Sequence, residues 1–207
     1  NDLFARIRHS TDLERRFTAD AAHELRKPVA AVRAQAEVAR STGDEAVRGK
    51  ALDQVIHACD RMGVLMEQLL TLARLEQAPS TQLQTPLDLA LIVRNAIAEL
   101  APAALQNGID ISLESSGNTT VTGRAALLDM LIRNLLSNAI QHGRSDVQVR
   151  IKALPGGVTL TVSDAGPGVA PADLTQLGDR FFRGGATGPG SGLGLSIVRR
   201  VADLHQA

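Results

Sequence analysis

The chain has 207 residues, 22 basic and 22 acidic side chains and a formal net charge of zero, so charge gives no case for nucleic acid or an anionic membrane as its main partner. A single cysteine, Cys59, excludes an internal disulfide and is typical of a reducing compartment. No secretory signal opens the chain and no uninterrupted apolar run reaches the roughly 18 residues that span a bilayer.

Residues 1–77 have the pattern of two amphipathic helices separated by a short break at residues 41–44. Gly43 is typical of a helix C-terminus, and Asp44 is typical of the N-cap of the next helix. One antiparallel hairpin leaves part of its apolar surface uncovered, so we predict that two copies pair into a homodimeric four-helix bundle. The second helix carries its apolar residues at a near-heptad spacing: Leu52, Val55, Ile56, Cys59, Met62, Leu65, Met66, Leu69, Leu72 and Leu75.

His23 and Glu24 lie in the middle of the first helix, a few residues before Pro28. At about 100° per residue, His23 is roughly 200° from the apolar Ala21 and Leu25, so we expect its imidazole to face solvent. Glu24 can then hold one ring nitrogen, which suits a nucleophile. A lone exposed histidine is usually only a solvated residue, so this interpretation depends on motifs further along the chain. The apolar stripe of this helix is Leu13, Phe17, Ala21, Leu25, Val32 and Ala36.

Residues 78–86 are expected to form a linker, because Pro79 and its polar neighbours stop the helix. Residues 87–207 then mix both patterns. Helices are predicted over 87–106, over 125–142 and from near Gly192, and strands over 109–113, 147–154 and 158–163, the last two as a hairpin. The fold class is therefore α+β: an N-terminal antiparallel helical hairpin followed by an α/β sandwich with helices on one face.

Three polar clusters mark the second half. Asn134, Asn138 and His142 recur every four residues and share one face of a predicted helix. Paired asparagines are usually surface or capping residues, but their amide oxygens also suit a magnesium ion that carries phosphates. Asp164, with Gly166 and Gly168 close behind, ends a predicted strand; a carboxylate there can accept a hydrogen bond from an amine such as that of adenine, although a plain loop has the same pattern.

The third cluster, Gly188-Pro-Gly190-Ser-Gly192-Leu-Gly194-Leu195, leads into a helix. Bare backbone N–H groups and the positive end of the helix dipole together suit a phosphate. The motif is neither a Walker loop nor a dinucleotide fingerprint. We expect the segment 184–194 to act as a lid over a nucleotide.

Taken in order, these motifs resemble the conserved boxes of bacterial sensor histidine kinases, across about residues 10–205. The segment around His23 is similar to the H box and 134–142 to the N box. Residues 164–168 are similar to the first glycine box, 177–183 to the F box and 190–195 to the second glycine box. The phrase at 17–26 is most similar to the QseC-type branch.

The resemblance implies a dimerisation and phosphotransfer hairpin over 1–77 and, over 87–207, an ATP-binding domain of the type shared by gyrase, Hsp90, histidine kinases and MutL. It implies that His23 is the phospho-acceptor, becoming phosphohistidine, and that Glu24 orients or deprotonates it. It also implies a response regulator as partner and a membrane-anchored parent whose cytoplasmic portion this is. The residues implied for ATP are Asn134, Asn138 (with Mg²⁺), His142, Asp164 (adenine amine), Gly166, Gly168, Arg180, Phe181, Arg183, Gly190, Gly192, Leu193, Gly194 and Leu195.

Three features depart from the family pattern. Lys27 stands where the family usually has Thr, Ser or Asn, which place a water for dephosphorylating the regulator; a charged lysine has only donors, so weak phosphatase and intact kinase activity are predicted. Gln141 replaces a frequent basic residue, and the chain ends at Ala207 where the family usually continues into further strands. These departures keep open a degenerate kinase or dimeric scaffold that binds nucleotide and regulator without efficient turnover. An ATPase of the gyrase or Hsp90 type is less well supported, because those lack the His-Glu hairpin.

Overall fold

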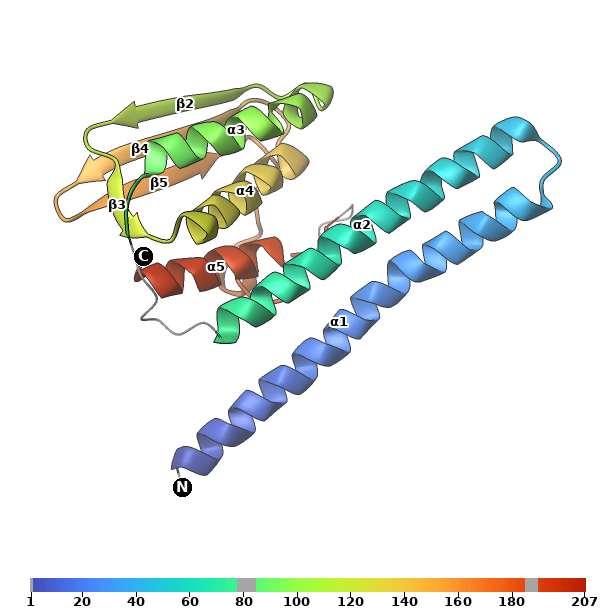
Figure 1. The fold of residues 1–207 in the computed structure, drawn as a ribbon, viewed down its shortest axis with the longest axis horizontal. Coiled ribbons are helices and arrows are strands. Elements are labelled where there is room, and N and C mark those ends of the chain that lie inside the picture. The colour runs from blue at the N-terminus through green and yellow to red at the C-terminus, as the bar shows by residue number, and fades with distance from the viewer. Residues whose placement is uncertain (1, 78–84, 185–189) are drawn as a thin grey trace. The chain divides into compact units, whose positions relative to one another are not determined.

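The computed structural model describes residues 2–77, 85–184 and 190–207, with side chains from residue 18 onward except those of residues 76 and 77. The chain divides into two compact units, Asn1–Arg74 and Leu75–Ala207 (Figure 1). Most of the predicted linker, residues 78–84, lies outside the described residues. Its last two positions, Thr85 and Pro86, belong to a strand of the second unit.

The first unit is the predicted helical hairpin, made of α1 (Asp2–Ser41) and α2 (Glu45–Gln77). Asp44 caps α2 as expected: its Oδ1 accepts the backbone N–H groups of Ala46 (2.8 Å) and Val47 (3.3 Å). α1 ends at Ser41, two residues before Gly43, in agreement with the predicted stop, although the φ of Gly43 is not positive. Arg48 satisfies carbonyls at the end of α1 instead, donating to Thr42 O (3.0 Å) and Ala39 O (3.4 Å).

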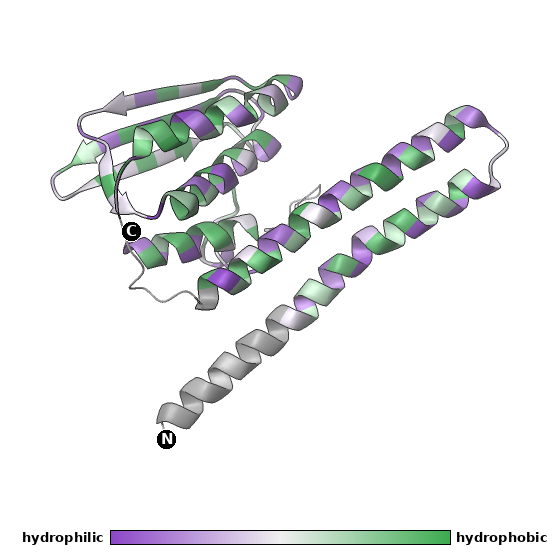
Figure 2. Ribbon diagram, in the orientation of Figure 1, coloured by the Kyte–Doolittle hydropathy of each residue, from purple (hydrophilic) through white to green (hydrophobic). Residues whose placement is uncertain are grey.

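The apolar residues of the hairpin fall into two sets. Every seventh residue of α2, from Ala51 through Ala58 and Leu65 to Leu72, is buried. A second set is at least two-fifths exposed, and Figure 2 shows hydrophobic bands alternating with hydrophilic ones along both helices. Because a single chain leaves this second set in water, the hairpin keeps an apolar surface for another molecule. Its members are Val29, Val38, Val47, Leu52, Ile56, Val64, Met66 and Leu70.

The second unit is built on a three-stranded sheet of order β2-β4-β5, with helices on one face (Figure 1). β2 (Ile111–Ser116) runs parallel to β4 (Val147–Leu154), which pairs antiparallel with β5 (Gly157–Ser163). A separate two-stranded sheet pairs β1 (Thr85–Asp88) with β3 (Thr120–Gly123). The helices α3 (Leu89–Gln106) and α4 (Ala125–His142) cover the main sheet, and α5 (Gly194–His205) packs beside α4. A short 3₁₀ turn spans Leu174–Gln176.

The core of this unit follows from the alternation of β4 and the apolar faces of α3 and α4. On β4, Val147, Val149 and Ile151 are fully buried, while the residues between them face away. Among the described helices, α3 alone has the length and composition to cross a membrane, although its apolar residues do not form one unbroken run. Its Val93 and Ala96 are fully buried in the domain core, so α3 acts here as a core helix.

Arg133 connects the two covering helices. Its Nη1 lies 2.6 Å from Glu99 Oε2 on α3, and its Nε lies 2.6 Å from Asp129 Oδ2 on α4. These carboxylates, Glu99 first, raise the pKa of Arg133 above its ordinary value. The pair with Glu99 therefore helps to fix the packing of α3 against α4. Because α4 carries Asn134, Asn138 and His142, it also helps to fix the position of that polar face.

The predicted helix at 125–142 and strand at 147–154 are confirmed residue for residue. The helix predicted from residue 87 begins at Leu89, because Asp88 ends β1 and caps the helix, accepting Ala90 N–H at 3.0 Å. The strand predicted at 109–113 runs over 111–116, the hairpin strand begins one residue early, at Gly157, and the last helix begins at Gly194. β1 and β3 were not predicted: four residues are too few to establish an alternation.

Candidate functional site

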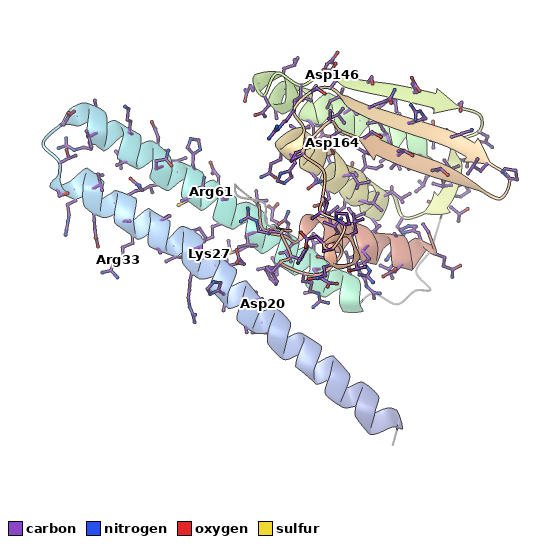
Figure 3. All side chains as sticks on the ribbon, turned by 180° about the vertical axis from the view of Figure 1, so that it is seen from behind. Asp20, Lys27, Arg33, Arg61, Asp146 and Asp164 are labelled. Carbon is purple, nitrogen blue, oxygen red and sulfur yellow. The ribbon has the colours of Figure 1, made fainter. Side chains whose placement is uncertain are left out.

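His23 is exposed on α1, as the helical periodicity predicts. No described residue forms a hydrogen bond with its imidazole. Glu24, whose side chain is only 17% exposed, forms an ion pair through Oε1 with the ammonium of Lys27, whose side chain is 55% exposed and is labelled in Figure 3. The ring nitrogens are therefore accessible from solvent, and the neighbouring carboxylate already has a cationic partner one turn along the helix.

In the second unit, α4 presents Asn134, Asn138 and His142 at successive turns. The Nδ2 of Asn134 donates to Met130 O at 2.9 Å. A Cβ built on Gly194, the first residue of α5, would lie 3.1 Å from that Oδ1. The N-box asparagine therefore lies directly against the start of the α5 helix, and neither Asn138 nor His142 hydrogen-bonds a described side chain.

Asp164 follows the last residue of β5 (Figure 3), and its Oδ1 accepts the N–H of Gly166 at 2.7 Å. A Cβ on Gly166 would approach His142 O to 2.6 Å, and one on Gly143 would approach Ala139 O to 2.4 Å and Asp164 Cβ to 3.5 Å. The first glycine box and the end of the N-box helix therefore touch through backbone that has no room for a side chain. The need for glycine at Gly143 escaped the sequence analysis, because a single glycine after a helix also reads as an ordinary stop.

The F box and the second glycine box are joined by a backbone contact. The N–H of Phe181 donates to the carbonyl of Gly192 at 2.9 Å. Both residues are left-handed, with φ of 61° and 70°, and a Cβ on Gly192 would lie 2.6 Å from the carbonyl carbon of Phe181. A non-glycine residue at positive φ is uncommon and often marks a functional segment. Gly190 lies close to α4 as well, since a Cβ there would be 3.7 Å from Gln141 Nε2.

Arg180 brings positive charge to this segment. Burial of its guanidinium, and after that the positive charge of Arg200, lowers the pKa of Arg180 below its ordinary value. A bound anion would offset both effects, which suits the binding of a phosphate group. Arg183, the other basic residue of the F box, is half-buried.

Some predicted residues have other tasks in the structure. The side chain of Leu193 is fully buried, its N–H is taken by Ser191 Oγ at 3.1 Å, and its carbonyl accepts Ile197 N–H at 3.0 Å. Leu193 therefore anchors the start of α5 in the core. Leu195 is half-buried, and Gly168 is left-handed (φ 71°) with open space around its Cα. Of the predicted lid, 184–194, residues 185–189 lie outside the described residues.

The donor set of this unit fits a nucleotide better than a metal held by protein alone. Among the described residues, no three His, Cys, Asp or Glu side chains gather as metal ligands. Magnesium usually binds one or two protein oxygens and completes its shell with phosphate and water, so the Asn138 amide oxygen suits an ion that arrives with a triphosphate. Asp164 uses Oδ1 on its own turn, which leaves Oδ2 for an exocyclic amine.

Comparison with known proteins assigns both units to described families. Residues 13–78 match the His Kinase A (phospho-acceptor) domain, and residues 123–207 match the histidine kinase-, DNA gyrase B- and HSP90-like ATPase. The first match contains His23, and the second contains all four boxes of the second unit. Between the two matches lie β1, α3, β2 and all of β3 except its last residue, Gly123.

Curated relatives are similar over nearly the whole chain. The sensor protein QseC of Salmonella typhi is 45% identical over 210 residues, which are 99% of this chain and 46% of that protein. The sensor protein kinase PmrB of Pseudomonas aeruginosa is 37% identical over 99% of this chain and 44% of its own length. The chain thus spans about half the length of the curated relatives that it matches.

Solved structures agree on the fold. The histidine kinase AdeS of Acinetobacter baumannii superposes with a TM-score of 0.68 at 22% identity, covering 88% of this chain and 86% of that one. Full-length ShkA, solved in complex with AMPPNP, superposes with a TM-score of 0.63 at 25% identity, covering 92% of this chain and 41% of that one.

Proposed function

The chain belongs to the sensor histidine kinases, and we propose that it phosphorylates itself on His23 from ATP and passes the phosphoryl group to an aspartate of a response regulator. The observation that carries this proposal is the exposed imidazole of His23, with no hydrogen bond to a described residue and with Glu24 beside it. Two contacts in the ATPase-like unit support the second half of the requirement: Asn134 Oδ1 lies against Gly194, and Asp164 lies beside Gly143 and Gly166 at the end of α4.

ATP binding is assigned to the second unit. The Oδ2 of Asp164 accepts the adenine amine, and the N-terminus of α5 at Gly194 receives phosphate oxygens through backbone N–H groups. Arg180 and Arg183 add positive charge near the terminal phosphate. Asn138 would hold magnesium through its amide oxygen, and the ion would supply charge neutralisation for the triphosphate.

Phosphoryl transfer then needs position and charge neutralisation more than acid or base strength. An unprotonated ring nitrogen of His23 attacks the γ-phosphorus in line; the N–P bond forms, the bond from phosphorus to the β,γ-bridging oxygen breaks, and ADP leaves with that electron pair. Glu24 accepts the N–H of the other ring nitrogen and stabilises the positive charge that develops on the imidazole. The acceptor aspartate of the regulator later attacks the same phosphorus and releases neutral His23.

The expected partners follow from the hairpin. The apolar set that includes Leu52 and Ile56 is covered by a second copy in a four-helix bundle, and a receiver domain docks where His23 is exposed. The parent protein is membrane-anchored, and this portion lies on its cytoplasmic side.

Phosphatase activity toward the regulator is weak, because Lys27 cannot accept a proton from water. Lys27→Thr should therefore speed dephosphorylation of the regulator, and an unchanged rate would contradict this role.

The deciding experiment uses ATP labelled with a radioactive γ-phosphate. Wild-type chain should acquire label that is stable in base and lost in acid, as a phosphoramidate is, and His23→Gln should acquire none. ATP hydrolysis without label on the protein would instead support an ATPase of the gyrase type. ATP binding with neither label nor hydrolysis would support a degenerate kinase or scaffold.

A further inference from the structure

We propose that Lys27 is a counter-ion shared by Glu24 and the phosphoryl group on His23, and that it shifts the autophosphorylation equilibrium toward phosphohistidine. This inference rests on the proposed function, in that His23 is the residue phosphorylated. In the unphosphorylated chain the ammonium of Lys27 pairs with Glu24 Oε1. After phosphorylation the same ammonium also contacts the phosphoryl oxygens.

The helix geometry allows both contacts. Lys27 follows Glu24 by three residues and His23 by four, and side chains at these spacings are neighbours on a helix, with Cβ atoms about 5–6 Å apart. Lysine carries three N–H donors on a flexible four-carbon stem, so it can serve two acceptors in turn or together. The Lys27 side chain is 55% exposed, so it is free to reorient, whereas Glu24 is 17% exposed and stays in place.

The charges around His23 favour such a counter-ion. A phosphoryl group brings a charge of about −1.5 to −2 at neutral pH. On His23 that charge stands next to the carboxylate of Glu24, and the two repel each other. Asp20, one turn before His23, adds a further negative charge on the helix, and Arg26, three residues after His23, is a second exposed cation on α1. Lys27 differs from Arg26 because it already holds the carboxylate that the new charge would repel.

A consequence concerns the reverse reaction. ADP can take the phosphoryl group back: the N–P bond breaks, the oxygen–phosphorus bond of ATP forms again, and His23 returns to its neutral state. A cation that stabilises the phosphorylated state lowers the fraction lost in this way. Thr, Ser or Asn at position 27 would offer no such charge. Lysine at this position therefore prolongs the lifetime of the phosphohistidine, while the chain loses a group that could accept a proton from water.

The first test measures the ratio of phosphorylated to unphosphorylated chain at equilibrium with fixed ATP and ADP. Lys27→Gln should lower this ratio about two- to fivefold, the range expected for an exposed ion pair, and Lys27→Arg should retain it. The effect should shrink as salt rises. Arg33→Gln is the matched control: it breaks an exposed pair with Glu37 (3.1 Å) on the same helix, about 15 Å from His23, and should leave the ratio unchanged.

The second test does not depend on ATP. Phosphoramidate can transfer its phosphoryl group to the imidazole, releasing ammonia, and phosphorus NMR then follows the titration of that group. Its pKa, ordinarily about 6 for a phosphoryl group, should rise in Lys27→Gln and stay in place in Lys27→Arg and Arg33→Gln. A merely structural lysine would not move this titration.

The outcomes separate the inference from the proposed function. If wild type takes label from neither ATP nor phosphoramidate on His23, the proposed function fails and the inference fails with it. If His23 takes label but Lys27→Gln matches wild type in both measurements, the inference alone is wrong. An effect of Arg26→Gln in place of Lys27→Gln would also overturn it, since it would assign the counter-ion to the other cation.

Discussion

Substituting Gly192 by alanine should separate the second glycine box from the F box. The magnitude follows from two terms. An L-residue at φ of 70° costs roughly 1–2 kcal/mol. The added Cβ would also lie 2.6, 2.8 and 2.9 Å from the C, Cα and O atoms of Phe181, and this backbone cannot retreat without losing the Phe181 N–H to Gly192 O bond, worth about 1 kcal/mol.

The two terms together amount to about 2–3 kcal/mol, and they destabilise the backbone conformation of the segment that is proposed to bind the phosphates. Because about 1.4 kcal/mol is a factor of ten in a binding constant, Gly192→Ala should lower the affinity for ATP at least tenfold. Isothermal titration calorimetry of ATP into the purified chain measures this directly, and urea unfolding checks that the domain remains folded.

Gly156→Ala is the matched control. Gly156 is also left-handed, with φ of 90°, but a Cβ there meets nothing within 4 Å, and it lies in the turn between β4 and β5. This variant should lose a similar amount of stability to backbone strain and keep its ATP affinity. If Gly192→Ala binds ATP within twofold of Gly156→Ala, the contact with Phe181 does not shape the phosphate site and the reasoning is refuted.

Three further predictions concern other parts of the chain. Gly49→Ala should raise the free energy of unfolding by about 0.5–1 kcal/mol in urea melts, because Gly49 is an exposed helical residue with nothing within 4 Å of an added Cβ; a loss of stability would contradict this. Asp164→Ala should lower the affinity for ATP but leave the affinity for inorganic tripolyphosphate, measured by competition, unchanged, because its carboxylate is assigned to the adenine base. Equal losses of affinity for both ligands would be inconsistent with that role. The Thr119 hydroxyl first, then backbone N–H groups and Arg94, hold the pKa of Asp88 below its ordinary 3.8, so its stabilising effect is present above that pH and lost as pH falls through the folded value. Asp88→Asn should therefore flatten the acid limb of a stability–pH curve, and an unchanged limb would show that Asp88 does not contribute to it.

The parts of the fold that were predictable are those with a long regular pattern. The helix 125–142 and the strand 147–154 each repeat their apolar period several times, and their packing partners agree with that pattern. β1 and β3 have four residues each and pair only with one another, so nothing local distinguishes them from loop. Asp88 is a further case. It is the last residue of β1, and its carboxylate caps α3. The same carboxylate accepts a hydrogen bond from Thr119, 31 residues away in sequence, and no local pattern predicts that contact.

The site shows the same division. Motif spacing predicts the members of the candidate site that carry charge or an amide oxygen, such as Asp164 and Asn134, because these side chains have few other reasons to recur in that order. It did not bring out Gly143, whose role is to leave space, or the use of Leu193 as the anchor of α5. Absence of a side chain becomes informative only when the atoms that would collide with it are known.

The turn of the hairpin closes α1 with a side chain that comes from α2. A helix end leaves carbonyl groups without partners, and a left-handed glycine usually brings N–H groups to them. Gly43 does not adopt that conformation, and the guanidinium of Arg48 reaches back from α2 to the carbonyls of Thr42 and Ala39 while its Nη1 pairs with Glu45 at 2.6 Å. The closing group therefore belongs to the second helix, which ties the end of α1 to the start of α2.

The apolar pattern of α2 is denser than one hairpin can use, and the structure explains why. A strict seven-residue series, Ala51, Ala58, Leu65 and Leu72, is buried within the single chain. Leu52 and Ile56, which belong to the predicted near-heptad set, stay about half exposed beside it. Two adjacent apolar seams on one helix require two partners, and α1 is one antiparallel neighbour. An aliphatic seam left in water favours association, and the homodimer proposed above would cover it with a copy of the same hairpin, which offers a self-complementary surface.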